Sequence, residues 1–209
     1  MFKLNFIAAT VLWAGASFAA DSVQLQEQLD SKDLHRVELD VAVGQVDIQV
    51  VEGTDIKLDV ELEPDNNWLG FGPDLSDARI EMRQQGDKVK IRIELDADDD
   101  DVKQSWTIQL PQHLALALDL GVGSIDIDGM KQDAKVDVGV GDVDFTLDTR
   151  LYQSIELDAG VGDTGISGGA GRYQTERAMV TSNSKLSGSG TFTLKANVGV
   201  GDIKVKHQQ

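Results

Sequence analysis

Aspartates recur at equivalent positions of a repeated segment, and they are the residues best suited to chemistry. Asp119, Asp137 and Asp158 each stand two residues before a glycine, whereas Asp142 and Asp163 directly follow one. If the repeats are neighbouring β-strands, these carboxylates form an outward-facing column and a corner column beside it, in which like charges repel. A divalent cation such as calcium binds several carboxylate and carbonyl oxygens and would relieve that repulsion.

The same aspartates also suit a purely structural role. Aspartate side chains commonly hydrogen-bond to the backbone at turns, and outward carboxylates keep a surface hydrated. The nine-residue glycine and aspartate period of calcium-binding β-rolls is absent. The structural interpretation is therefore favoured, and calcium binding is kept as the alternative. The acidic run at 96–101 is a second cation candidate, for which a solvated loop is favoured.

A loop with aromatic residues is the best candidate for contact with a partner. Trp68, Leu69 and Phe71 lie among glycines and a proline in a long segment between two predicted strands. Loops longer than about 12 residues are often functional, and tryptophan often anchors interfaces. The alternative is that Trp68 and Phe71 cover an open end of the apolar interior.

Catalytic groupings are poorly supported. His35, His113 and His207 are the only histidines, each has different sequence neighbours, and the chain has no cysteine. A carboxylate-pair glycosidase needs an acid of raised pKa in a partly apolar cleft, whereas the acids here alternate onto open strand faces. We expect no enzyme activity and no cofactor apart from the calcium of the alternative.

The elements that position these residues form an internal repeat. Segments of the type apolar-Asp-apolar-Gly-apolar-Gly align with their second glycine at positions 44, 123, 141, 162 and 201, with gaps of 79, 18, 21 and 39 residues. Met179–Leu186 resembles a degenerate copy within the last gap. The glycines assigned a structural role are Gly44, Gly121, Gly123, Gly139, Gly141, Gly160, Gly162, Gly199 and Gly201.

Each copy alternates apolar and polar residues, which is typical of a half-buried strand. The next apolar residue after Val140 is Val143, so the pair between them shifts the register and directs both flanking strands to one interior. A hairpin turn or a corner within one solenoid coil would explain this shift, and the regular period favours the corner. The predicted fold is all-β: a single elongated β-solenoid-like domain of stacked strands, with coils of about 20 residues.

The expected organisation is a cleaved signal peptide at 1–19, a lead-in at 20–36 and a β-strand-repeat domain at 37–209. Within that domain, 52–112 is a less regular hairpin region and 113–206 carries the regular repeats. We expect Ile203–Lys206, with its outward lysines, to be a protected terminal edge of the stack.

Composition limits the location and the partners. A charge of −17 disfavours nucleic-acid binding, which depends on lysine and arginine. The signal peptide is predicted from Lys3, the apolar run that follows and the small residues Ser17 and Ala19. We therefore expect export to the periplasm or the cell surface, with no membrane span in the mature chain.

The Gly-x-Gly repeats, preceded by a strand ending at Leu110-Pro111, resemble the bacterial "putative adhesin" β-strand-repeat family, also called toast-rack domains. The resemblance implies an exported stacked-strand domain of unknown function, proposed for adhesion or envelope-stress signalling and without catalytic residues. It leads us to expect a non-catalytic envelope interaction or adhesion module that binds an envelope protein or a surface polysaccharide.

Overall fold

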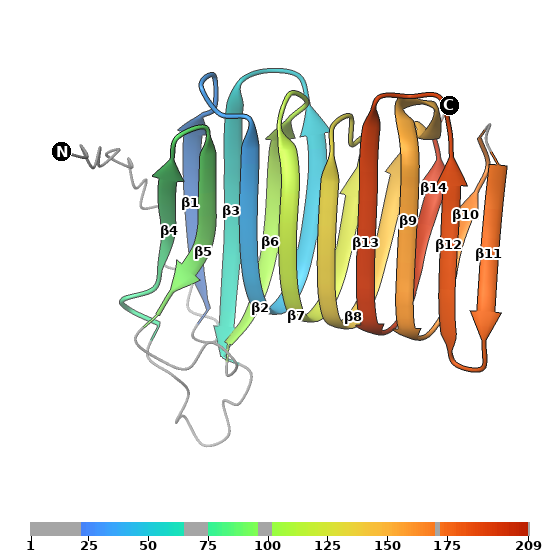
Figure 1. The fold of residues 1–209 in the computed structure, drawn as a ribbon. Helices are drawn as coiled ribbons and strands as arrows, with labels where there is room; N and C mark the ends of the chain where they lie inside the picture. The colour runs from blue at the N-terminus through green and yellow to red at the C-terminus, as the bar shows by residue number, and fades with distance from the viewer. Residues whose placement is uncertain (1–21, 65–74, 96–101, 170–171, 209) are drawn as a thin grey trace.

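The computed structural model describes residues 22–64, 75–95, 102–169 and 172–208, which form an all-β structure (Figure 1). The predicted signal peptide lies outside the described residues. So do the acidic run at 96–101 and the loop residues Trp68, Leu69 and Phe71.

The strands within these ranges belong to one hydrogen-bonded network. In chain order they are β1 (Val23–Asp30), β2 (Arg36–Val51), β3 (Asp55–Pro64), β4 (Arg79–Gln85), β5 (Lys88–Glu94), β6 (Val102–Pro111), β7 (Ala115–Asp128), β8 (Ala134–Leu147), β9 (Tyr152–Val161), β10 (Thr164–Ser167), β11 (Arg172–Ala178), β12 (Thr181–Ser187), β13 (Phe192–Val200) and β14 (Ile203–His207). A single turn of 3-10 helix, η3 (Thr149–Leu151), precedes β9.

Long strands that bend at the Gly-x-Gly segments give the molecule two layers. The first halves of β2, β7 and β8 lie in one layer with β9 and β13, and their second halves lie in the other with β10 and β14 (Figure 1). Neighbouring coils pair in parallel with matched registers, so that Gly44 faces Gly123, which faces Gly141. The predicted solenoid corner is therefore confirmed, and the hairpin-turn interpretation of the repeats is wrong.

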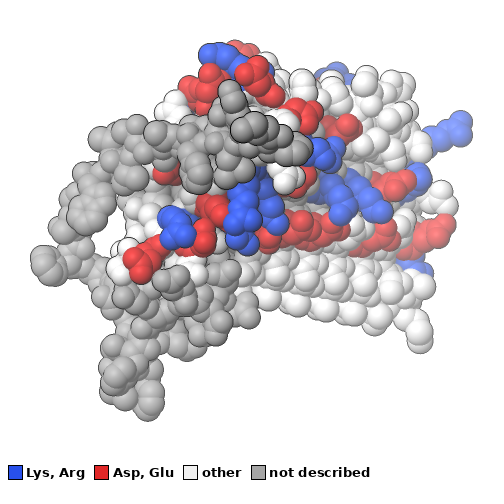
Figure 2. Space-filling model, turned by 60° about the vertical axis from the view of Figure 1, so that its left-hand side comes forward, with Lys and Arg blue, Asp and Glu red and all other residues white. Residues whose placement is uncertain are grey.

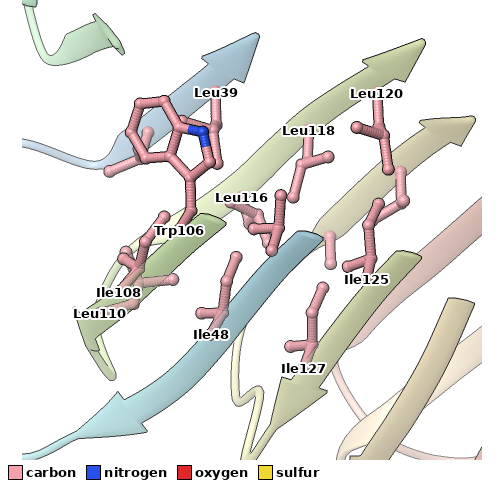
Figure 3. Packing of buried hydrophobic residues seen from close by; sticks show 14 of the residues in the cluster. Leu39, Ile48, Trp106, Ile108, Leu110, Leu116, Leu118, Leu120, Ile125 and Ile127 are labelled. Atoms are coloured by element: carbon pink, nitrogen blue, oxygen red, sulfur yellow. The ribbon is translucent and has the colours of Figure 1, made fainter. Parts of the chain in front are cut away.

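The core lies between the two layers and is built from ladders of similar apolar residues. Leu39 of β2 pairs with Leu118 of β7 in one layer, and Ile48 pairs with Ile127 in the other. These side chains are at most 3% exposed and point toward one another across the interior (Figure 3). Trp106 of β6, the strand beside β2, is also buried in this core. Its indole nitrogen donates to Gln104 Oε1 at 3.0 Å.

The order of the coils in space differs from their order in the chain. The last unit, β13 with β14, inserts between β8 and the preceding unit, β9 with β10, and pairs in parallel with both. The expectation that Ile203–Lys206 forms the terminal edge of the stack is therefore wrong. Its lysines instead face the outward carboxylates of β8, where Lys206 Nζ lies 3.2 Å from Asp144 Oδ1.

Antiparallel strands complete both ends of the stack. β1 and β3 extend one layer beyond β6, while β4 and β5 form the predicted hairpin beside β2 in the other. At the far end, β11 and β12 form a hairpin that pairs with β9. Met179–Leu186 is thus not a degenerate coil, because β12 runs antiparallel to its neighbour.

Candidate functional site

The corner glycines occupy two positions in β7, β8 and the two later coils, whereas the β2 coil has Ala42 at the first position and Gly44 at the second. Gly123, Gly141, Gly162 and Gly201 have φ between +140° and +148°, a conformation that residues with a Cβ rarely adopt. A Cβ added to Gly141 would also overlap the carbonyl oxygen of Gly123. The repeated glycines therefore allow the coils to stack closely at the corner.

The other repeated glycine forms the floor of a groove on the outer face. A Cβ on Gly139 would lie 2.5 Å from the carbonyl oxygen of Gly121, and Gly121, Gly160 and Gly199 have similarly close neighbours. With only glycines and the small Ala42 in this row, an open groove of about 530 Å³ runs across the first coils, bordered by Asp119. A second hollow continues past Gly160 toward the β11–β12 hairpin.

A ridge of valines lies along the corner, between the two glycines of each coil. The members of this valine ridge are Val122, Val140, Val161 and Val200, each 46–48% exposed. Pairing places them side by side in the order Val122, Val140, Val200, Val161. The expectation that Val140 points into the interior is wrong. Val138 and Val143 are buried in that interior, whereas Val140 lies at the bend of the strand with its side chain exposed.

The outward column contains asparagines as well as aspartates. Asp119 pairs with Asp137 as expected, but Asn197 of the inserted β13 separates Asp137 from Asp158. The prediction that the three aspartates lie on successive coils is therefore wrong. Asn197 Nδ2 donates to Asp137 Oδ1 at 2.5 Å, and Asn183 Nδ2 of β12 donates to Asp158 Oδ1 at 2.6 Å.

These neighbours change the carboxylate pKa values in opposite directions. Burial raises the pKa of Asp137, but hydrogen bonds from Lys135 and Asn197 outweigh it and hold that pKa below its ordinary value. Asp119 accepts no hydrogen bond from the described side chains. Its pKa is raised by partial burial and then by the negative charges of Asp137 and Asp40. Asp119 is thus a carboxylate beside the groove that no side chain of the described ranges compensates with a hydrogen bond.

The corner aspartates form a hydrogen-bonded chain through the backbone. Asp202 of the inserted coil lies between Asp142 and Asp163, which the sequence places in one corner column. The backbone amide of Asp202 donates to Asp142 Oδ1 at 2.8 Å, and that of Asp163 donates to Asp202 Oδ1 at 2.9 Å. Arg177 of β11 pairs with Asp163 at 2.5 Å. These carboxylates link successive coils while their charges stay at the surface.

Neither a metal site nor a catalytic site emerges from the described part of the chain. Within it, no group of three histidine, cysteine, aspartate or glutamate side chains is arranged to hold a metal ion. His113 contacts the backbone oxygen of Ser31 at 3.1 Å, and His207 contacts Thr149 Oγ1 at 3.1 Å, so these histidines serve different local contacts. Calcium binding by the aspartates stays a prediction.

Sequence reasoning missed three parts of this site: the interleaved asparagines, Asp202 and the exposure of the valines. Asn197 and Asp202 were visible as the last aligned copy, with asparagine at the position that carries aspartate in other copies. Their place between β8 and β9 could not be read from that alignment, because it preserves chain order.

Comparison with known proteins agrees with this architecture. The family described as "N-terminal domain of toast_rack, DUF2154" matches residues 19–167, which extends to the end of β10. The chain belongs to this family of stacked-strand domains. No curated protein matches the chain significantly.

Two solved structures are similar to the chain. One, described as a putative cell adhesion protein from Clostridium sporogenes, has 15% identity and a TM-score of 0.50, and the match covers 90% of this chain and 100% of that protein. The other, a putative adhesin from Bacteroides fragilis, has 18% identity and a TM-score of 0.36, with 88% of this chain and 97% of that protein covered. The first similarity supports the fold. No helix within the described ranges has the length and apolarity to span a membrane.

Proposed function

We propose that this protein is an exported, non-catalytic interaction or adhesion module of the cell envelope. It binds an envelope protein or a surface polysaccharide through the outer face at the corner of its coils. The valine ridge carries this proposal. Scattered exposed apolar residues are normal, but a continuous row of them on an otherwise charged protein is typical of an interaction surface.

Other observations support the proposal. The structure from Clostridium sporogenes is described as a putative cell adhesion protein, and the resemblance seen in the sequence implies an exported domain. The predicted signal peptide supports a periplasmic or surface location. A role in envelope-stress signalling would follow from such binding and rests on the resemblance alone. Contact through Trp68, Leu69 and Phe71 stays a second prediction.

The test is retention of the labelled mature chain on cell envelopes. In the ridge variant, Val122, Val140, Val161 and Val200 are all replaced by threonine, which keeps the branched shape and the strand preference. The control variant combines Gln49→Thr, Asp128→Thr and Lys206→Thr. These residues lie beside Thr146 in one outward column of the layer that the second halves of β2, β7 and β8 form with β14. We expect the ridge variant to lose most retention and the control to keep it. Equal retention of both variants would refute the proposal.

A further inference from the structure

The valine ridge lies between two rows of polar and acidic groups. On one side, across the glycine floor, is the outward column that contains Asp119, Asp137 and Asp158; on the other is the corner row of Asp142, Asp202 and Asp163. On the face shown in Figure 2, acidic side chains form a row that crosses the coils, with lysines and arginines along one side of it and uncharged residues along the other. The ridge therefore presents an apolar strip with carboxylates along both margins, of which Asp137 is paired with Lys135 and Asp163 with Arg177.

We infer that this strip binds a basic amphipathic helix of a partner protein, whose apolar face covers the valines while its lysines and arginines meet the flanking aspartates. The inference rests on the proposed function and names the chemistry of the partner. It follows from charge complementarity: an apolar strip between two acidic rows matches an apolar strip between two basic rows.

The spacing of the coils favours a helix over an extended segment. Neighbouring coils are separated by about 4.8 Å, and a helix advances about 5.4 Å per turn. Over the three steps from Val122 to Val161, the positions of successive helix turns and of successive coils therefore drift apart by only about 2 Å. Side chains on one face of an extended strand recur every 6.8 Å or so and would diverge by about 6 Å. A helix can therefore place one apolar side chain against each coil.

The charges of the site favour a basic ligand. Lys204 and Arg177 lie beside Asp202 and Asp163, whereas Asp142 accepts a backbone amide, and that bond leaves its negative charge in place. Asp119 has no hydrogen-bond donor among the described side chains, and an ammonium or guanidinium group of the partner would supply one. With a net charge of −17, the protein would also repel an acidic segment or a second copy of itself.

The test uses a fluorescent leucine–lysine peptide of about 18 residues, designed as an amphipathic helix of five turns. Anisotropy measures its binding to the mature protein, and circular dichroism measures its helicity. We expect saturable binding with a gain in helicity, weakened at least about tenfold by the ridge variant. The column variant, Asp119→Asn with Asp158→Asn, should weaken binding severalfold at low salt. The control variant of the retention test and a scrambled peptide separate ridge binding from general attraction of cations.

Several outcomes would overturn the inference. Equal affinity for the scrambled peptide, or equal affinity of the ridge variant, would mean unspecific charge attraction. Ridge-dependent binding to phosphatidylcholine vesicles, with none to the peptide, would mean that the ridge contacts lipid. If the peptide fails to bind while envelope retention still depends on the ridge, the partner chemistry is wrong and the proposed function stands. Loss of both would refute both.

Discussion

Replacement of Asn197 by aspartate tests how this protein tolerates a column of carboxylates. In the native chain Asn197 donates to Asp137 and separates its charge from that of Asp158. The variant removes this hydrogen bond and extends the row of Asp40, Asp119 and Asp137 to five carboxylates on consecutive strands. The lost charge-assisted hydrogen bond and two new like-charge pairs, all partly solvated, should together lower the free energy of unfolding by about 2 kcal/mol.

The pH dependence gives the sign of the effect. The pKa of Asp137 is lowered in the native protein, so its stabilisation is present above the unfolded pKa and is lost as pH falls through the folded pKa. In the variant, the neighbouring charges should raise the pKa values of the carboxylates in this row. Repulsion between these carboxylates then destabilises the variant fully at pH 7, and this destabilisation disappears as the carboxylates become protonated. The difference from the native protein should therefore shrink between pH 7 and about 3.

The assay is urea and thermal unfolding of the mature chain at several pH values, with Gln208→Glu as a control that adds the same charge at an exposed terminal position. For a domain of this size, the melting temperature of the Asn197→Asp variant should fall by about 4–8 °C at pH 7. Calcium should restore part of this loss, because the variant has a carboxylate column of five strands where the native column is interrupted after Asp137. An unchanged stability at pH 7, or a deficit that persists at pH 3, would refute the reasoning.

Four further predictions can be tested by unfolding or by envelope retention. Gly139→Ala should lower the free energy of unfolding by about 1–3 kcal/mol, because its Cβ meets the carbonyl oxygen of Gly121, whereas Gly165→Ala, with open space around it, should have little effect in urea unfolding. Asp119→Asn should raise stability at pH 7 by up to about 1 kcal/mol and have no effect at pH 3, because the raised pKa of Asp119 makes its charged form unfavourable. Calcium chloride and sodium chloride at equal ionic strength should raise the native melting temperature equally; a larger calcium effect, reversed by a chelator, would support the calcium alternative. Trp68→Ala should reduce envelope retention with little change in melting temperature, and a large fall in melting temperature would indicate a covering role instead.

Much of the local architecture was predictable from sequence. The alternation around Val136 and Val138 indicates strands with one buried face, and both side chains are buried. The register step at Gly141 indicates a corner, and the positive φ there explains why glycine is needed. The hairpin of β4 and β5 lies within 52–112, the segment predicted to be a hairpin region. These features depend on interactions within one coil or one turn.

The candidate site was only partly predictable. The sequence pattern identified the aspartate columns, but Asn197 and Asp202 determine how their charges are arranged. Val140 continues the apolar alternation, so the pattern predicts burial. Its exposure results from the bend, which uses an additional residue at the corner and leaves the next position outside the core.

The sequence by itself determined the coil: two half-buried strands, a corner that requires glycine and an outward carboxylate. Only the tertiary structure decided the order of the coils, because their matching apolar faces allow many different neighbours to pair. The β11–β12 hairpin covers the far side of β9, and the returning β13–β14 unit pairs between β8 and β9, where Asn197 separates two carboxylates and Lys206 meets Asp144. Such contacts join residues that are distant in the chain, so a local sequence pattern does not predict them.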